Sequence, residues 1–445
     1  MFPNPHDAIP LPPRPSLERY RNLAKGLAAA CKSGAADAIG DWAGQWVREI
    51  AKLVGPTRQH ELDHWIDTVE AFARRRMLGG PSASRKCALA DAQFVIARSH
   101  GFAAWPRFAG HLEALATSGS PVSRFEAAAD AIVGGAAPVL RLLLRQEPEL
   151  VRARSTREHG ATLLHYVAAN GVEGYRQKTP RNIVAIARIL LRAGAEVDAA
   201  ANVYGGGCTA LGLAATSVHP ERAGVQEALL QTLLDHGARL EPPPAAGNRQ
   251  SLVAACVANG RQRAAAFLAA RGAPLDLAAA AALGRLDAVA AFLGEDGAKT
   301  DAAKEQLDDA FLFACGNGHN AVIELLLAHG ADLAAHRGGG QTALHWAAIG
   351  GHPETVELLL RHRPPLEVRN AYGGTVLEQA LWSAAHGGDP DVYLPILQAL
   401  AAAGAKLPER HVPVNPRVDR WLAQQGSRAE PAWHWSGEEP RRGAH

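Results

Sequence analysis

The chain has 445 residues, a formal net charge of +2 and a hydrophobic content of 47%. The near-neutral charge argues against a surface built for nucleic acid or acidic membranes, and the apolar content excludes a mostly disordered protein. No apolar run approaches the roughly 20 residues that span a bilayer, so no membrane-spanning helix is expected.

The start of the chain, MFPNPHDAIPLPPRP, is rich in proline and lacks the basic and then apolar pattern of a signal peptide. We predict a tail over residues 1–15 and a cytoplasmic protein. The five cysteines form no Cys-x-x-Cys pair, which indicates neither a disulfide framework nor a zinc ribbon. Small buried thiols in a reducing compartment are expected at Cys31, Cys87, Cys208, Cys256 and Cys315.

Residues 16–120 are predicted to form a helical N-terminal domain. The apolar spacing predicts one helix in SLERYRNLAKGLAAACKSG, a second over 57–78 and a helix–turn–helix pair over 87–115. In that pair Gly101 and Phe102 should form the turn. The second helix should bury a stripe made of Trp105, Phe108, His111 and Leu112. The segment GGPSAS at 79–84 is expected to be a flexible linker.

The sequence HELDH at 60–64 has the spacing of a zinc-hydrolase helix. His60 and His64 would share one face and Glu61 would activate a bound water molecule. Against this, Asp63 places a charge inside the motif, and no downstream motif supplies an obvious third ligand. A solvated helix face is the main interpretation, with a zinc-dependent hydrolase through His60, Glu61 and His64 as the alternative.

A second alternative is DNA binding by the helix–turn–helix-like segment 86–117. Its second helix begins FAAWPRF, which offers Arg107 as its one basic side chain for the bases. A helical cap that covers the apolar end of a repeat array is the favoured role, because the first repeat must shield its outward face. Nucleic acid is therefore not an expected partner.

The remainder of the chain is periodic. Thr342 and Thr375 lie 33 residues apart, and so do Gly318 and Gly351. Each period has two short apolar helices joined by a glycine-containing turn. Because neither helix can bury its apolar face alone, the units must stack.

These residues carry a resemblance. TALHWAAIGGH at 342–352 and HGADL at 329–333 resemble the ankyrin repeat, and ATLLHYVAANG at 161–171 is a looser copy. The segment LADAQFVIARSHGF is similar to a leader that precedes such repeats in some bacterial proteins. The resemblance implies an all-α solenoid of about eight repeats over residues 124–407, some of them degenerate, with a concave binding face. A capping segment and tail at 408–445 complete the predicted domains.

The repeat's threonine and histidine are expected to be structural. In such repeats the threonine caps the inner helix and the histidine hydrogen-bonds across the turn. We therefore interpret His165 and His345 as scaffold residues rather than catalysts.

Three units carry insertions between their two helices, of eleven, seven and eight residues. Thr179-Pro180, His219-Pro220 and Asp389-Pro390 are each expected to start a helix after the insertion. The first insertion contains GVEGYRQK at 171–178. Its tyrosine beside an arginine has the composition of an interface anchor, although the loop could equally cover its own extended helix.

We expect the first two insertions to touch and to supply binding residues, and concave positions to supply others. The resemblance implies exposed concave positions that include Glu158 and His159. The predicted partner-binding residues are Tyr175, Arg176, Lys178, Arg181, His219, Arg222, Tyr204, Tyr372 and Trp382.

The predicted function is a non-enzymatic scaffold that binds an unidentified protein, without a cofactor, a metal or a membrane. No nucleophile and base can be assembled from the sequence. The sequence leaves the oligomeric state open.

Overall fold

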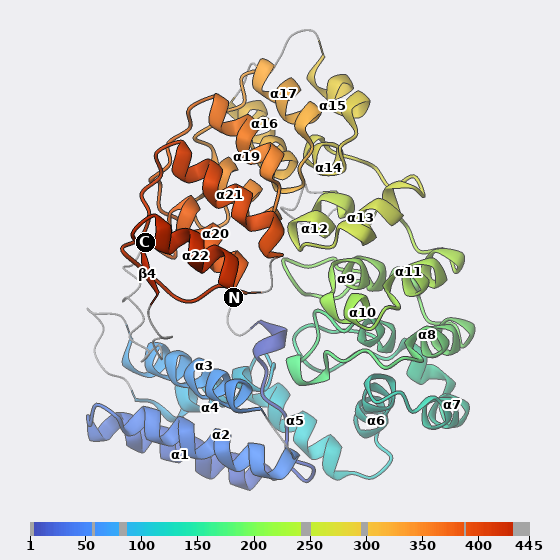
Figure 1. The fold of residues 1–445 in the computed structure, drawn as a ribbon. Coiled ribbons are helices and arrows are strands. Elements are labelled where there is room, and N and C mark those ends of the chain that lie inside the picture. Colours follow the sequence, from blue (N-terminus) through green and yellow to red (C-terminus); the bar gives the residue numbers. More distant parts are fainter. Residues whose placement is uncertain are drawn as a thin grey trace. The chain divides into compact units, whose positions relative to one another are not determined.

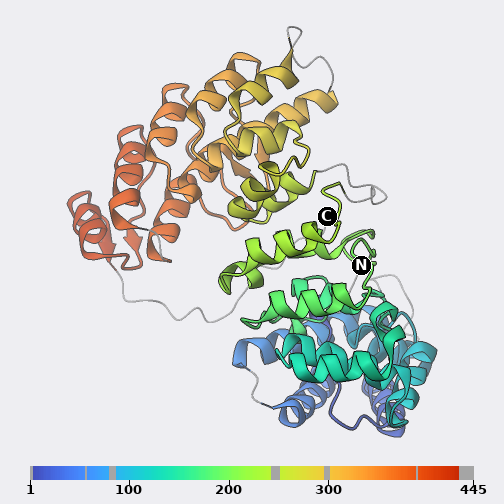
Figure 2. The ribbon, with the colours of Figure 1, turned by 90° about the vertical axis from the view of Figure 1, so that its right-hand side faces the viewer.

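The computed structural model describes residues 4–55, 58–79, 87–241, 251–294, 301–386 and 389–429. The chain divides into two compact units, Met1–Pro274 and Leu275–His445. Each is built of short helices (Figures 1 and 2). We describe the two units in turn.

The N-terminal unit begins with five α-helices. Serine caps the first of them: Ser16 accepts a hydrogen bond from the Arg19 amide, and Gly34 ends it in the left-handed conformation. The helices are α1 (Leu17–Ser33), α2 (Ala38–Val54), α3 (Gln59–Leu78), α4 (Leu89–Ser99) and α5 (Trp105–Ala116). The predicted helices are confirmed, and α2 is an additional helix that the apolar spacing did not indicate. Most of the predicted linker 79–84 lies outside the described residues.

An aromatic core holds these helices together. Phe102 and Phe108 are fully buried, and the rings of Tyr20 and His100 pack against Phe108. Gly101 has a φ of +83°, so it forms the turn between α4 and α5 as predicted. The stripe predicted on α5 is confirmed, with Phe108, His111 and Leu112 buried and Trp105 partly buried.

One expectation about the cysteines is wrong. Cys31 and Cys87 form a disulfide with their Cα atoms 5.6 Å apart, which joins the end of α1 to the residues before α4. The two residues are 56 positions apart, so spacing alone could not reveal the pair. Of the three free cysteines, Cys256 and Cys315 are buried thiols as predicted, and Cys208 is half-buried.

The proline-rich start of the chain packs onto this unit. Ala8 and Ile9 are buried, and the Ile9 amide donates to the Ser99 carbonyl over 2.9 Å. The short helix η1 (Pro5–Asp7) lies against the first insertion.

Helix pairs form the rest of the N-terminal unit. Their elements are α6 (Pro121–Val133), α7 (Ala137–Gln146), η2 (Pro148–Arg152), η3 (Leu163–Ala168), η4 (Gly174–Arg176), α8 (Ile183–Arg192), α9 (Ala210–Thr216), α10 (Val218–Arg222), α11 (Gln226–Asp235), α12 (Leu252–Ala258) and α13 (Gln262–Ala269). The inner element of the second repeat, η3, is a 3₁₀-helix rather than an α-helix.

The three predicted helix starts after the insertions have different outcomes. Asp389 caps its helix, accepting from the Asp391 amide, as predicted. Pro220 lies inside the separate short helix α10. Thr179-Pro180 does not start a helix. Helix α8 begins only at Ile183, because residues 180–183 form a turn closed by the Ile183 amide and the Pro180 carbonyl.

The C-terminal unit continues the helix pairs. Its elements are α14 (Leu277–Ala282), α15 (Leu286–Leu293), α16 (Asp301–Gly316), α17 (Asn320–Ala328), β1 (His336–Arg337), β2 (Gln341–Thr342), α18 (Ala343–Gly350), α19 (Pro353–Arg361), α20 (Val376–Ala385), α21 (Pro390–Ala402), β3 (Arg410–His411), α22 (Pro416–Gln424) and β4 (Arg428–Ala429). Strands β1 and β2 pair antiparallel with His336 opposite Thr342, and β3 pairs parallel with β4.

The core of this unit repeats from one helix pair to the next. Leu326 and Leu359, from equivalent leucine triplets, are fully buried in it. Val418 and Leu422 of α22 join the same core beside Leu400 of α21, so α22 covers the last repeat. In the described ranges no helix combines the length and apolar character needed to cross a bilayer.

The threonine–histidine pairs have the predicted structural role. The Thr162 amide donates to Nδ1 of His165 over 3.1 Å, and Nε2 of that ring lies 3.2 Å from the Cys208 carbonyl of the following repeat. Thr342 and His345 repeat this arrangement, with His345 reaching the Gly374 carbonyl. Each histidine therefore joins its own turn to the next repeat.

Candidate functional site

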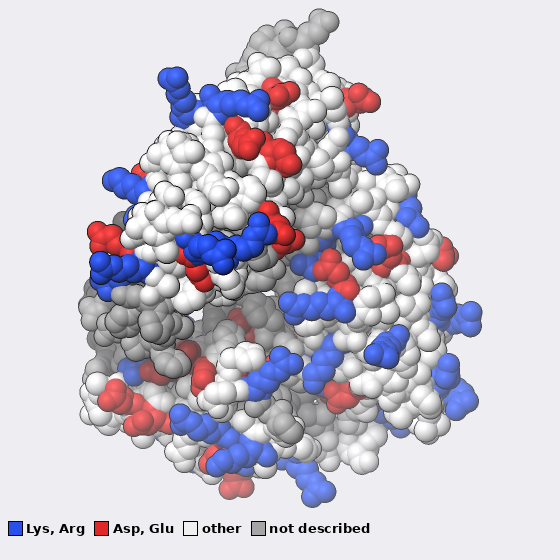
Figure 3. Space-filling model, viewed as in Figure 1, with Lys and Arg blue, Asp and Glu red and all other residues white. Residues whose placement is uncertain are grey.

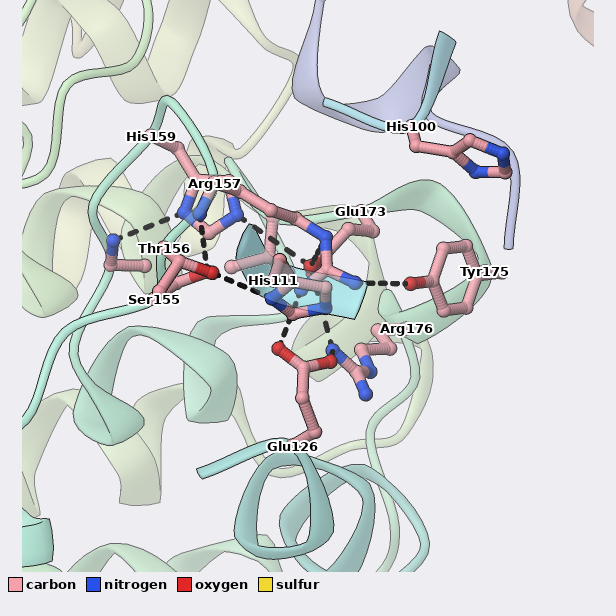
Figure 4. A network of polar contacts seen from close by, with 12 residues as sticks. His100, His111, Glu126, Ser155, Thr156, Arg157, His159, Glu173, Tyr175 and Arg176 are labelled. Carbon is pink, nitrogen blue, oxygen red and sulfur yellow. Dashed lines mark hydrogen bonds and ion pairs between the residues drawn. The ribbon is translucent and has the colours of Figure 1, made fainter. Parts of the chain in front are cut away.

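The first insertion folds inward. Val172 and Glu173 are fully buried, Arg176 is 5% exposed and Tyr175 is half-buried. The expectation of an exposed tyrosine is therefore wrong. Its side chain points into a polar network rather than into solvent (Figure 4).

Two arginines and two glutamates form the centre of this network. Arg157 donates to Glu126 over 2.6 Å and pairs with Glu173 through Nε at 2.9 Å. Arg176 donates to the other oxygen of Glu126 over 2.7 Å and makes two contacts with Asp130. Because positive and negative groups alternate, each buried charge has at least one partner of opposite charge. A charge can be buried only with such a partner.

Helix α6 supplies Glu126 and Asp130 from adjacent turns, since residues four apart share a helix face. Arg157 comes from the turn before η3. Glu173 precedes η4 and Arg176 is the last residue of η4. Three segments of the unit thus meet at one set of ion pairs.

Burial and charge act in opposite directions on the glutamates. Burial alone would raise the pKa of Glu126, but the charges of Arg157 and Arg176 outweigh it and hold this pKa at about 2. The same two arginines hold the pKa of Glu173 well below its usual value. Both carboxylates are therefore ionised at neutral pH.

Two buried histidines border the ion pairs. Burial, helped by the charge of Arg157, lowers the pKa of His111 to about 4, and its Nδ1 lies 2.7 Å from the Thr156 hydroxyl. Nδ1 of His159 accepts from the Ala161 amide over 3.0 Å. The expectation that His159 and Glu158 are exposed is wrong, because His159 is 3% exposed and Glu158 pairs with Arg98.

The network borders a cleft of about 450 Å³ that is lined in part by the chain from Leu11 to Pro15. Arg157 and Arg176 line it, together with Tyr175, whose hydroxyl accepts from Arg157 over 3.3 Å. The charges of both arginines are already paired with carboxylates. The arrangement is suited to joining segments of the chain rather than to binding an ion or exchanging a proton.

Sequence reasoning missed Glu126, Arg157 and Glu173. The available signal was in RFEAAADAIV, where Glu126 and Asp130 interrupt an otherwise apolar helix at a spacing of four. Acidic residues among core positions predict buried cationic partners, but they do not say which arginine supplies them.

Among the described residues, no polar contact joins the two insertions. Arg176 pairs with Asp130 of α6 and Tyr175 accepts from Arg157, and in the described part of the chain no hydrogen bond or ion pair joins residues 175–181 to residues 219–222. The repeats meet instead at the bases of the loops, where Ser217 donates to the Ala169 carbonyl. Lys178, Arg181 and Arg222 are exposed and His219 is half-buried.

The other predicted binding residues lie on exposed surfaces of their units. Tyr204 is 52% exposed and its hydroxyl donates to Asn170 over 2.8 Å. Tyr372, 85% exposed, lies on the turn before α20, and Trp382 in α20 is 58% exposed. The Trp382 ring stacks on His386 with centroids 4.2 Å apart. Binding by these nine residues stays a prediction.

The zinc-hydrolase alternative has no support. Glu61 accepts from the Arg58 amide at the start of α3, and His64 lies 3.3 Å from Asp7. His60 is exposed. Within the described ranges no three His, Cys, Asp or Glu side chains are grouped as metal ligands would be.

The DNA-binding alternative also has no support. The helix that would read the bases, α5, buries Phe108, His111 and Leu112, and His111 contacts Thr156 of the first repeats. The face of α5 that carries these residues therefore packs inside this unit.

Part of the chain matches a known family model. Residues 275–370 and 311–409 match the model described as ankyrin repeats (3 copies). No curated protein matches. Among solved structures, the crystal structure of the ankyrin repeat domain of Bcl-3, described as a unique member of the IkappaB protein family, shares 22% identity at a TM-score of 0.29. The match covers 61% of this chain and 97% of the Bcl-3 chain.

The family match falls on the unit in which the helix pairs, the turn between β1 and β2 and the threonine–histidine bridge are described above. The predicted all-α fold class, with ankyrin-like repeats and a helical N-terminal part, is confirmed. The chain is an all-helical protein whose residues 275–409 match the ankyrin-repeat model.

Proposed function

We propose that this protein is a non-enzymatic scaffold that binds a partner protein through aromatic side chains exposed on its ankyrin repeats. The observation that carries the proposal is the exposure of Tyr372 and Trp382, at 85% and 58%, on successive parts of one repeat. Large aromatic side chains gain most from burial in an interface and dominate its energetics.

Stacking prepares Trp382 for such a role. The His386 ring lies nearly parallel to it, at 16°, and Nδ1 of His386 is 2.8 Å from the Trp382 carbonyl. A side chain already held in one rotamer loses less conformational entropy when a partner binds.

The buried network supports a non-enzymatic role. Glu126 stays ionised because its pKa is held at about 2, and His111 and His165 stay neutral because burial lowers their pKa values to about 4. Groups whose pKa values lie this far from 7 are poorly suited to exchange protons during catalysis near pH 7. A cytoplasmic location stays a prediction.

The test is affinity capture from the native host's lysate, read by mass spectrometry. Wild type is compared with the double variant Tyr372→Ala/Trp382→Ala. The control is Phe292→Ala, because Phe292 of α15 is 51% exposed in the same unit. We expect a protein that wild type and the control capture and the double variant loses. Equal capture by all three, or no specific capture by wild type, would contradict the proposal.

The exposed residues of the insertions and Tyr204 form a second candidate part of the partner surface. Deleting the first insertion would confuse binding with stability, because Glu173 and Arg176 hold the buried network. The variant Lys178→Ala/Arg181→Ala/Arg222→Ala changes only exposed side chains. Reduced capture with an unchanged unfolding midpoint would assign binding to the insertions, and unchanged capture would limit their role to structure.

A further inference from the structure

Two neighbouring outer helices of the N-terminal unit carry arginines and no acidic residue. Helix α7 reads APVLRLLLRQ and α8 reads IVAIARILLR. Arg141 and Arg145 are four residues apart, as are Arg188 and Arg192, so each pair shares one helix face. All four side chains are exposed.

The two pairs occupy equivalent positions in successive repeats. LLLR at 142–145 corresponds to ILLR at 189–192, so both arginines recur after 47 residues. Helices α7 and α8 pack against each other, and packed helices lie about 8–10 Å apart. The four arginine positions therefore form a two-by-two array on the two helices. Figure 3 shows Lys and Arg side chains gathered along the edge where Figure 1 places α7 and α8.

The structure shows no polar contact between these arginine side chains and the rest of the described protein. Among the described residues, none of the four makes an ion pair or a side-chain hydrogen bond, whereas Arg124 of α6 pairs with Glu147. Other outer helices carry different residues at the positions equivalent to Arg141 and Arg145. Helix α11 has Gln231 and Asp235, and α19 has Glu357 and Arg361, an acid–base pair.

Helix stability does not explain the array. A cation in the last turn interacts favourably with the helix dipole, which accounts for Arg145 and Arg192. Arg141 and Arg188 lie a full turn earlier, and like charges four residues apart destabilise a helix by a few tenths of a kcal/mol.

Exposed apolar side chains lie on α7, the helix that carries the first arginine pair. Val139 and Leu142 of α7 are 48% and 47% exposed. We propose that Arg141, Arg145, Arg188 and Arg192, with Val139 and Leu142, form a docking surface for an acidic, partly apolar segment of a partner protein. We call this the arginine surface. Carboxylates accept paired hydrogen bonds from guanidinium groups, and aliphatic side chains of the segment would cover the valine and the leucine.

The apolar pair favours a protein segment over nucleic acid, because phosphate contacts use cationic and polar groups and gain nothing from exposed Val or Leu. The near-neutral net charge points the same way. This inference concerns a surface separate from Tyr372 and Trp382 and does not depend on them.

The probe is a fluorescein-labelled synthetic peptide of alternating glutamate and leucine pairs, titrated with the full chain and followed by fluorescence anisotropy. The test variant replaces Arg141, Arg145, Arg188 and Arg192 with Gln. The control replaces Arg75, Arg107, Arg361 and Arg420 with Gln, since these are also exposed and the net charge changes equally. A third variant, Val139→Ser/Leu142→Ser, tests the apolar contribution.

We expect the test variant to bind the peptide about tenfold more weakly or worse, and the control to remain within about twofold of wild type. Val139→Ser/Leu142→Ser should also weaken binding. Rising salt should weaken binding to wild type. Equal losses in test and control variants, no binding by wild type at low salt, or tighter binding to a short DNA duplex or to phosphatidylserine vesicles would overturn the proposal.

Discussion

Arg176 shows at the scale of one residue why the first insertion exists. Its guanidinium contacts Glu126, Glu173 and Asp130. Burial would lower the pKa of Arg176, but the electrostatic interactions with Tyr175, Glu126 and Glu173 outweigh burial and raise this pKa well above its usual value. A tyrosine–arginine dipeptide that has the composition of an interface anchor is here the centre of a polar core. A buried ion is tolerated only with its partners, so the residues act as a set.

Replacing Arg176 with Ala should therefore be strongly destabilising. The change leaves Glu126 and Glu173 buried with one arginine between them, and we expect a loss of about 3–5 kcal/mol in the free energy of unfolding. Urea unfolding followed by circular dichroism measures it. Arg181→Ala is the matched control, because Arg181 is exposed, and it should change stability by less than about 0.5 kcal/mol. Similar losses for both variants would contradict a structural role for the network.

The buried histidines predict how stability depends on pH. Burial lowers the pKa values of His111 and His165 to about 4, against 6.5 in an unfolded chain. Between these values the unfolded state binds protons that the folded state cannot, so the stability falls as the pH falls. Each histidine should lower the free energy of unfolding by about 2 kcal/mol between pH 7 and pH 5.

Glu126 contributes little in that window, because its lowered pKa affects stability mainly below its usual value of 4.5. Urea unfolding at pH 7, 6 and 5 tests this prediction. His165→Asn should reduce the slope, and a stability that is flat from pH 7 to pH 5 would refute it.

At the scale of elements, η1 and η4 are joined by a close backbone approach. A Cβ added to Gly174 would lie 2.2 Å from the carbonyl oxygen of His6, and neither group can move without displacing a segment of the chain. Glycine at this position lets the start of the chain lie on the insertion.

Gly174→Ala should therefore release the start of the chain. We expect faster hydrogen exchange at the Ile9 amide, which bonds to Ser99, and a loss of about 1–3 kcal/mol in stability. Gly110→Ala is the control, because Gly110 lies in α5 with open space around it. Unchanged exchange in Gly174→Ala would mean that η1 does not lie on η4.

The disulfide also acts between elements, connecting α1 to the chain before α4. Alkylation of the denatured, unreduced protein should label Cys208, Cys256 and Cys315 only. Because the bond closes a long loop, reduction should lower the free energy of unfolding by about 4 kcal/mol, and Cys31→Ser/Cys87→Ser should be insensitive to reductant. Labelling of all five cysteines would refute the pairing.

At the scale of the molecule, the chain contains separate cores. One cluster of buried side chains joins α14 to α22 within the C-terminal unit, and an aromatic cluster joins α1 to α5 within the other. Repeats gain stability from their nearest neighbours, so an array that contains its own terminal cap is expected to fold alone.

A fragment of residues 275–429 should therefore unfold cooperatively by itself, with α22 as its end cap. Thermal unfolding followed by circular dichroism measures this. The control fragment 275–407 lacks α22, exposes the core that Val418 and Leu422 cover, and should melt at a lower temperature. A 275–429 fragment with no cooperative transition would show that its core depends on the rest of the chain.

The repeats, the inner-helix caps and the stripe on α5 could be predicted because they depend on local spacing. Thr342 and His345 bond within one turn, and Phe108 and Leu112 share a helix face whatever lies opposite. The missed features join distant positions. The Cys31–Cys87 bond and the contact of Arg176 with Glu126, 50 residues away, leave no periodic trace in the sequence.

The sequence by itself thus determined the all-helical repeats, because each repeat must bury the same apolar faces and so repeats the same residues. Only the tertiary structure decided what the first insertion does. Tyr175 and Arg176 are polar enough for a surface. The burial of Arg176 depends on the carboxylates of α6 and of Glu173, and Tyr175 joins the network through its hydrogen bond with Arg157. Long-range charge pairing decides which polar residues are buried, and it becomes visible only after the chain has folded.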